Sequence, residues 1–279
     1  MIVNYTKLLA DDCKLYGTVD NSPLNSMQAD LNNLVEWSQK WQLPFNENKC
    51  KVMHLGFGNR KLDYFMDDHC LETVESEKDL GVIVDDELKF RKHAAAVTKK
   101  ANQFLGTIKR TYQTRDAGTI STLYKAMVRP HLEYANSIWG PFYQGDINMV
   151  EKIQHRATKL IPSLSNKPYE ERLMALKLPS LVYRRKRGDM IQMYKIMNKL
   201  IRIDAGALFT SQMSAFTRGH TQRVFKQHAK KNARVFSFSQ RVTNDWNSLP
   251  QFVVSAPSLN IFKNRLDKFW KDLMYKTNH

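Results

Sequence analysis

Apolar side chains recur with a helical period along the second part of the chain. From residue 87 onward they repeat every three or four positions, the spacing that places side chains on one face of an α-helix. The pattern predicts helices at residues 87–113, 117–138, 146–161, 168–177, 179–202 and 258–275. We expect a buried stripe on the fifth of these helices, formed by Met190, Met193, Tyr194, Met197, Leu200 and Ile201.

The first 86 residues follow a different pattern, in which short apolar runs are separated by polar turns. Runs of this kind predict β-strands, here two within residues 1–20 and others within 49–57, 63–67 and 71–86. One helix interrupts them, because Ser22 is a suitable N-cap and Pro23 suits the first helical turn. Its expected apolar face carries Met27, Leu31, Leu34, Trp37 and Trp41. The two patterns together predict a protein of the α+β class.

Charge divides the chain at nearly the same place. Residues 1–88 carry 8 Lys/Arg and 16 Asp/Glu, a net charge of −8, whereas residues 89–279 carry 35 and 11, a net charge of +24. A strongly basic region typically binds a polyanion such as nucleic acid; a soluble surface that happens to be basic is the alternative. Pattern and charge predict three regions, at residues 1–86, 87–202 and 203–279.

Cysteine usage and hydropathy exclude several classes of protein. The three cysteines, Cys13, Cys50 and Cys70, match no zinc or disulfide framework, so we expect core residues in a reducing compartment. No apolar run reaches the roughly 20 residues that a membrane-spanning helix needs, so no membrane partner is expected. These features predict a nuclear or cytoplasmic protein.

Pairs of adjacent aspartates are the first candidates for metal chemistry. Asp85–Asp86 precede an expected helix, whose free N–H groups they can cap, and Asp67–Asp68 lie in a polar turn. Asp11 and Asp12 differ, because strand-like sequence flanks them on both sides. A tight hairpin can hold both carboxylates at a sheet edge, where Mg²⁺ offsets their repulsion. Turn formation is the alternative for this pair, since aspartate is a common turn residue.

The sequence LLADDCKLYG around this pair resembles the Phe/Tyr-Ala-Asp-Asp motif of reverse transcriptases, in the form found in non-LTR (LINE-like) retrotransposons. Leu9 stands where that family usually has an aromatic residue. Similar segments follow in the family's order over essentially the whole chain, at residues 31–56, 76–110, 123–141, 153–161 and 238–250. The resemblance implies an incomplete polymerase palm, a small antiparallel sheet with a helix, followed by a mainly helical thumb and C-terminal region.

The resemblance also implies roles for individual residues. Asp11 and Asp12 would bind the catalytic Mg²⁺, and Lys49 would lie near the incoming phosphates. The family's chemistry needs a third carboxylate from an earlier palm strand, and fingers that hold the template, whereas this chain begins ten residues before its aspartate pair. We therefore expect a truncated RNA-directed DNA polymerase that binds Mg²⁺ weakly and is inactive without its N-terminal half. The alternative is a catalytically dead nucleic-acid-binding protein or a domesticated interaction protein.

Two basic segments are candidates for binding RNA and DNA. The helix expected at 87–113 carries cations that can follow a phosphate backbone: Lys92, Lys99, Lys100, Lys109, Arg110 and Arg115. The second segment has four cations in succession: Arg184, Arg185, Lys186 and Arg187. Four successive helical residues span about 300° of azimuth, so they cannot form one stripe. The alternatives are a solvated helix face for the first segment and, for the second, an Arg185–Asp189 pair or a nuclear-localisation patch.

Overall fold

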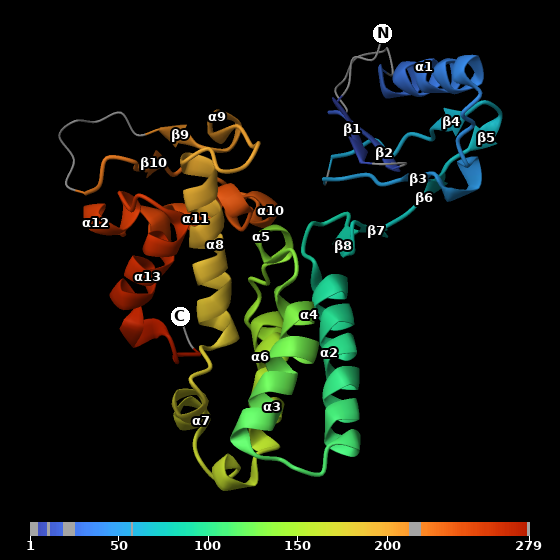
Figure 1. The fold of residues 1–279 in the computed structure, drawn as a ribbon. Coiled ribbons are helices and arrows are strands. Elements are labelled where there is room, and N and C mark those ends of the chain that lie inside the picture. The colour runs from blue at the N-terminus through green and yellow to red at the C-terminus, as the bar shows by residue number, and fades with distance from the viewer. Residues whose placement is uncertain (1–4, 10–11, 19–25, 57, 212–218, 278–279) are drawn as a thin grey trace. The chain divides into compact units, whose positions relative to one another are not determined.

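The protein forms two compact units that divide the chain at its charge boundary. The computed structural model describes residues 5–9, 12–18, 26–56, 58–211 and 219–277 (Figure 1). The N-terminal unit comprises Met1–Leu88 and the C-terminal unit Lys89–His279. The regions expected at 87–202 and 203–279 therefore belong almost entirely to one unit, because helices from both pack on the same central helix.

The N-terminal unit contains short strand pairs and one long helix. Its elements are β1 (Tyr5–Leu9), β2 (Asp12–Tyr16), α1 (Ser26–Trp41), η1 (Glu47–Lys49), β3 (Lys51–Val52), β4 (Phe65–Met66), β5 (His69–Cys70), β6 (Glu72–Thr73), β7 (Ser76–Asp79) and β8 (Val82–Asp85). In the described part of this unit, β1–β2, β4–β5 and β7–β8 are antiparallel pairs, and β3–β6 is a parallel pair. The small antiparallel sheet expected from the resemblance is thus a set of separate two-stranded pairs.

Helix α1 buries a different face from the one that its sequence suggests. Met27 and Leu31 pack against the small core of the unit as expected, and Val35 is fully part of that core. Trp37 and Trp41 are 47% and 61% exposed. The expectation that both tryptophans lie in the core is wrong, because α1 packs against the two-residue strand β4 and its buried face is centred nearer Val35.

Helix α2 (Arg91–Thr111) begins several residues after the Asp85–Asp86 pair. Its N-cap residue, Phe90, has a left-handed backbone with φ of 56° and makes no side-chain cap hydrogen bond. Asp85 instead ends β8 and is buried, and the Asp86 N–H donates to the Glu75 carbonyl at 3.0 Å. Asp85 and Asp86 are therefore not at the expected start of the helix, because α2 begins at Arg91 and not at residue 87.

The C-terminal unit is mainly helical. After α2 come α3 (Ala117–Leu123), the π-helix η2 (Tyr124–Val128), α4 (Arg129–Glu133), α5 (Asn136–Trp139), α6 (Gln144–Lys159), η3 (Pro162–Leu164), α7 (Tyr169–Leu176) and α8 (Leu181–Met197). The remaining elements are α9 (Ala205–Leu208), β9 (Thr210–Ser211), β10 (Val224–Phe225), α10 (Asn232–Val235), α11 (Phe238–Asn247), α12 (Gln251–Val254), α13 (Leu259–Phe269) and η4 (Lys271–Leu273). Among the described helices, none has the length and apolar character that crossing a bilayer requires.

The helix expected at 117–138 is divided into shorter pieces. Pro130 has no N–H to donate, and its ring crowds the carbonyl one turn earlier, which accounts for the widened π-helical turn before α4. Helix α4 ends at Glu133, Ala135 adopts a left-handed backbone with φ of 51°, and α5 begins at Asn136. This bend brings Glu133 and Asn136 against α8, where both contact arginine residues.

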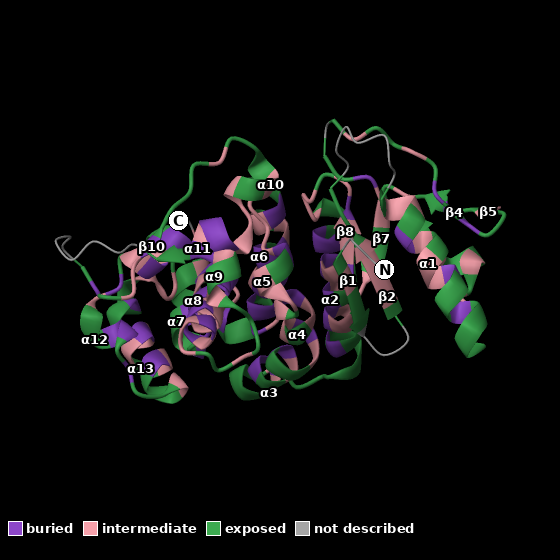
Figure 2. Ribbon diagram, turned by 90° about the horizontal axis from the view of Figure 1, so that it is seen from above, coloured by how far each residue is buried: buried purple, intermediate pink, exposed green. Residues whose placement is uncertain are grey.

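Helix α8 is the centre of the C-terminal unit. It packs against α5, α6, α11 and α13, and Figure 2 shows the helices of the unit buried on some faces and exposed on others. Met190, Met193 and Tyr194 are at most 2% exposed, which confirms the central part of the expected stripe. Leu200 is 54% exposed, because α8 ends at Met197 and the chain turns away before it. Other members of this core are Val242, Trp246, Phe262, Leu266 and Trp270.

A buried carboxylate fixes the first turn of α8. Glu151 on α6 accepts hydrogen bonds from the N–H groups of Leu181 and Val182, each at 3.2 Å, and from the Tyr169 hydroxyl at 2.7 Å. Helix N-termini leave such N–H groups without intrahelical partners, and the helix dipole favours a negative charge beside them. Glu151 therefore joins α6 and α7 to the start of α8, next to the N-cap Ser180.

Arg241 ties α11 to two other parts of the unit. Its guanidinium donates to both carboxylate oxygens of Asp189 on α8, at 2.8 and 3.0 Å. It also donates to the backbone carbonyls of Asn136, Ser137 and Phe236, at 3.2, 2.9 and 3.2 Å. Burial raises the pKa of Asp189, and the nearby Arg241 acts in the opposite direction. This ion pair therefore links α5, α8 and α11 in a region from which most water is excluded.

Replacing Arg241 by methionine is expected to lower the free energy of unfolding by about 3–5 kcal/mol, because it leaves the Asp189 carboxylate buried without its partner. The double variant Arg241→Met/Asp189→Leu should be more stable than the single variant, since it removes both charges together. Urea denaturation followed by far-UV circular dichroism measures both effects. Equal stability of the wild type and Arg241→Met would contradict the role given to this pair.

The β1–β2 hairpin leaves apolar side chains on the surface. Tyr5 and Leu8 are 74% and 73% exposed, and Tyr16, which stacks on Tyr5, is 47% exposed. Among the described strands, β1 pairs with β2 alone. A strand edge with unpaired backbone groups and exposed apolar side chains promotes association between molecules.

Leu8→Lys is expected to reduce aggregation without loss of helical circular dichroism, because a charge on a strand edge opposes pairing with a second chain. Leu15→Lys is the matched control in the same hairpin: Leu15 is half-buried, so a charge there should destabilise the hairpin and not improve solubility. Sedimentation at matched concentrations compares the three proteins. A monodisperse wild-type monomer would show that the exposed hairpin edge causes no association.

Candidate nucleic-acid interface

Asp12, the second residue of the expected aspartate pair, begins strand β2 of the β1–β2 hairpin. The register of this hairpin sets Leu9 opposite Asp12 and Leu8 opposite Cys13. Asp12 is exposed, whereas Asp11 lies outside the described residues. The structure therefore describes one of the two carboxylates that were expected to bind Mg²⁺.

Lys49, expected near the incoming phosphates, is exposed at the end of η1. Burial raises the pKa of the Cys13 thiol, and the neighbouring Cys50 thiol raises it further. Because Cys13 follows Asp12 and Cys50 follows Lys49, this interaction places the hairpin close to the end of η1 within the N-terminal unit. No hydrogen bond or ion pair joins Lys49 to Asp12 in the part of the chain that the structure describes.

The described side chains do not assemble a metal centre. Within the described ranges, no group of three or more His, Cys, Asp or Glu side chains is arranged to hold a metal ion. Lys14 on β2 pairs with Asp79 on β7, so this carboxylate near the hairpin already has a cationic partner. The described residues alone do not form the two-metal arrangement of phosphoryl transfer, and Asp11 lies outside them, so we derive no catalytic step here.

Helix α2 separates an apolar face from a cationic one. It packs against α4 and α6, and its buried residues are His93, Ala94, Thr98, Ala101, Leu105 and Ile108. With 3.6 residues per turn, Lys92, Lys99 and Arg110 project within about 20° of one another on the opposite side of the helix. All three are exposed. These residues, the α2 cation stripe, extend over about 27 Å of the helix axis.

The surface between these cations is hollowed, because the side chains there are small or polar. A shallow hollow of about 610 Å³ lies along α2 and is lined by Thr98, Lys99, Asn102, Gln103, Gly106, Thr107 and Arg110. At Gly106 an added Cβ would meet no atom within 4 Å. Arg156 on α6 donates a hydrogen bond to Asn102 at 3.0 Å and adds a further cation to the edge of the hollow. An extended polyanion can therefore approach the helix closely along this face.

The other cations predicted on this helix flank the stripe. Lys100 and Lys109 are exposed and lie roughly 80–100° to either side of it. Burial lowers the pKa of His131, and the positive charge of Lys100 lowers it further. Arg115, beyond the end of α2, is half-buried and donates to the Lys109 carbonyl at 3.3 Å. Of the six cations predicted to bind phosphates, three therefore form the α2 cation stripe and three lie outside it.

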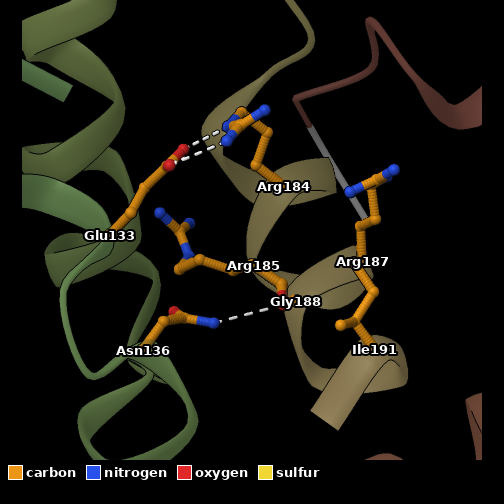
Figure 3. A pocket seen from close by; sticks show the side chains of 7 residues that line it. All are labelled: Glu133, Asn136, Arg184, Arg185, Arg187, Gly188 and Ile191. Atoms are coloured by element: carbon orange, nitrogen blue, oxygen red, sulfur yellow. Dashed lines mark hydrogen bonds and ion pairs between the residues drawn. The ribbon is translucent and has the colours of Figure 1, made fainter. Parts of the chain in front are cut away.

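The second basic segment, residues 184–187, forms ion pairs inside the C-terminal unit. Arg184 makes a two-fold ion pair with Glu133, with 2.8 Å between Nη2 and Oε2 (Figure 3). Arg187 makes a similar pair with Asp267, at 2.5 and 2.8 Å. These hydrogen bonds raise the pKa of both arginine side chains. Both guanidinium groups are thus already matched by carboxylates from neighbouring helices.

The two remaining cations of this segment also differ from expectation. Lys186 lies 3.8 Å from Asp245, and Arg185 is only 8% exposed. Asp189, considered as the partner of Arg185 one turn further on, forms its ion pair with Arg241 instead. The four cations point to different sides of α8, and each side faces another element of the unit. The four cations therefore form no single stripe, as their succession on a helix predicts, and the structure engages them within the unit.

Comparison with known proteins gives two distant relatives. The chain is 23% identical over 158 residues to the probable RNA-directed DNA polymerase from transposon X-element of Drosophila melanogaster, which covers 54% of this chain and 17% of that protein. It is 24% identical over 220 residues to the RNA-directed DNA polymerase from mobile element jockey of Drosophila funebris, covering 73% and 23%. The chain thus contains a region similar to reverse transcriptases. No family profile and no solved structure matches it.

Sequence reasoning missed three residues that contribute to this surface. Arg156 reaches the hollow from another helix, 54 residues from its partner Asn102, so no local pattern links them. Gln103 and Gly106 lie between Lys99 and Arg110 at spacings of four, three and four residues. This helical spacing is a signal that the sequence does carry, because it places small and polar side chains in line with the cations.

Proposed function

We propose that this chain is part of a non-LTR retrotransposon reverse transcriptase and that its C-terminal unit binds RNA and DNA. The N-terminal unit would be the last part of the palm, and the C-terminal unit would contain the thumb and the C-terminal region. The matched regions span 17% and 23% of those two proteins. On this proposal the chain is one part of a longer polymerase. Polymerase sequence encoded immediately upstream of Met1 would support this assignment.

The α2 cation stripe is the observation that carries nucleic-acid binding. Lys92, Lys99 and Arg110 are spaced about 10.5 and 16.5 Å apart along one side of a rigid helix. Each cation that neutralises a phosphate releases a condensed counterion, and this release is the main source of affinity that does not depend on sequence. The net charge of +24 over residues 89–279 adds long-range attraction to a polyanion.

Polymerisation by the isolated chain is not expected. Phosphoryl transfer depends almost entirely on positioned metal ions and substrates, and among the described residues Asp12 lies in no group of three potential ligands. Primer extension on an RNA template with Mg²⁺ should therefore yield no templated product from the purified chain. The outcome that contradicts this is Mg²⁺-dependent extension that Asp11→Asn or Asp12→Asn abolishes.

The second candidate function is nucleic-acid binding or protein interaction without catalysis. It is favoured by the contrast between the two units: the described strands of the N-terminal unit surround a core of four buried residues, Val35, Tyr64, Met66 and Leu71, whereas the C-terminal unit has an extensive core of its own. Primer extension by the chain joined to its upstream half would separate the two functions. Templated product indicates the polymerase, and its absence indicates the binding protein.

Replacing the α2 cation stripe by glutamine, as Lys92→Gln/Lys99→Gln/Arg110→Gln, is expected to weaken binding to an RNA–DNA hybrid. If each cation neutralises one phosphate, the slope of log affinity against log salt should fall by about 2.7. Gel-shift titration at several salt concentrations measures both the affinity and the slope.

The matched control removes the same charge elsewhere in the unit, as Lys226→Gln/Lys230→Gln/Lys231→Gln. These three lysines are exposed and lie outside α2. A control that weakens binding as much as the stripe variant would mean that affinity follows net charge and not this surface. Binding that is equal in fragments 1–88 and 89–279 would also contradict the proposal.

A further inference from the structure

A cavity of about 200 Å³ lies between α8 and the bend that joins α4 to α5. Its lining includes three arginines from α8, Arg184, Arg185 and Arg187, and Glu133 and Asn136 from the bend (Figure 3). All these residues belong to the C-terminal unit. The cavity lies on a different helix from the α2 cation stripe, so its chemistry is separate from that of the proposed hybrid-binding surface.

The charges around the cavity do not balance. Arg184 is matched by Glu133, and Arg187 is matched by Asp267, which lies outside the lining. Arg185 makes no ion pair with any described residue. One guanidinium in the lining therefore has no carboxylate in direct contact.

Arg185 is also unsatisfied in its hydrogen bonds. It is 8% exposed, and its Nη1 atom is buried with no hydrogen-bond partner. Figure 3 shows its guanidinium extending from α8 toward Glu133 and Asn136. Burial lowers the pKa of Arg185. The negative charges of Glu151, Asp189 and Glu133 act in the opposite direction and raise it. A buried charged donor without an acceptor is unfavourable, so an oxyanion in the cavity would remove this cost.

Asn136 indicates which oxyanion suits the site. Its Nδ2 atom donates to the Arg185 carbonyl at 3.2 Å, while its Oδ1 atom is buried and has no partner. The complete ligand must therefore both accept hydrogen bonds from a guanidinium and donate one to an amide oxygen. A phosphate group that carries a proton does both: inorganic phosphate keeps at least one proton throughout the neutral range, and a phosphate monoester keeps one below its second pKa of about 6. An ionised carboxylate or a phosphodiester has no proton to donate.

We infer that this cavity binds a monoprotonated phosphate group, with Arg185 and Asn136 as its ligands. The group is either inorganic phosphate or the terminal phosphate of a nucleotide. The cavity is large enough for the anion and a few waters, since one water occupies about 30 Å³ in the liquid. Arg184 and Arg187 stay with their carboxylates, so the charge that attracts the anion is that of Arg185.

The site is tested by titrating the full chain with inorganic phosphate. Calorimetry and ³¹P NMR monitor the binding. Saturable binding is expected for the wild type and should weaken at least tenfold in Arg185→Met. The control is Arg202→Met, because Arg202 is exposed and lies away from the cavity lining. Equal binding by the wild type and Arg185→Met, or no saturable binding at millimolar phosphate, would overturn the inference.

Thermal unfolding separates loss of the site from loss of the fold. In phosphate-free buffer Arg185→Met should melt no lower than the wild type, since it removes a buried charge without a partner. Above the dissociation constant, each tenfold increase in phosphate concentration should raise the Tm of the wild type by about 3 °C. The Tm of the variant should rise less. Gly188→Asp is a second variant: it sets a carboxylate in the cavity lining, where it competes with phosphate. Unchanged phosphate binding in Gly188→Asp would also count against the site.

Comparison of ligands identifies the source of the phosphate. Tighter binding of adenosine monophosphate than of inorganic phosphate indicates a nucleotide, and equal binding indicates the free anion; adenosine, which has no phosphate, should not bind. The Lys92→Gln/Lys99→Gln/Arg110→Gln variant should bind phosphate as the wild type does. Failure of the hybrid-binding proposal therefore leaves this inference standing, and failure of the phosphate titration leaves hybrid binding standing.

Discussion

The ion pair between Arg241 and Asp189 holds the C-terminal unit together at its centre. Arg241 bonds both carboxylate oxygens of Asp189 and three backbone carbonyls, so a single guanidinium joins α5, α8 and α11. Burial disfavours the charged form of Asp189. The ion pair can offset this cost only because its hydrogen bonds are well formed. Since α8 carries the methionine and tyrosine side chains of the core, its position also sets the packing of α13.

The same central position explains why the cations of α8 are not a surface feature. A helix surrounded by α5, α6, α11 and α13 presents every side to a neighbour, so charged residues on it need partners. Glu133 and Asp267 provide them for Arg184 and Arg187. The side of α8 that faces the α4–α5 bend is the exception, because the chain bends there and leaves a cavity beside Arg185.

Helix α2 shows the opposite arrangement on the edge of the same unit. One side packs against α4 and α6, and the other carries Lys92, Lys99 and Arg110 beside small and polar residues. The cations lie in line because their separations of seven and eleven residues are close to whole numbers of helical turns. A surface of this kind fits an extended polyanion, which we propose to be nucleic acid.

The sequence by itself determined the helical character after residue 87, the boundary of the two units and the alignment of the α2 cations. These features depend on residue spacing and composition, which are local properties of the chain. Only the tertiary structure decided that Trp37 and Trp41 are exposed, that α2 begins at Arg91, beyond Asp85 and Asp86, and that Asp189 pairs with Arg241. Each of these outcomes depends on which elements lie beside a residue. The periodicity of one segment cannot specify that, because it records the faces of a helix or strand and not what covers them.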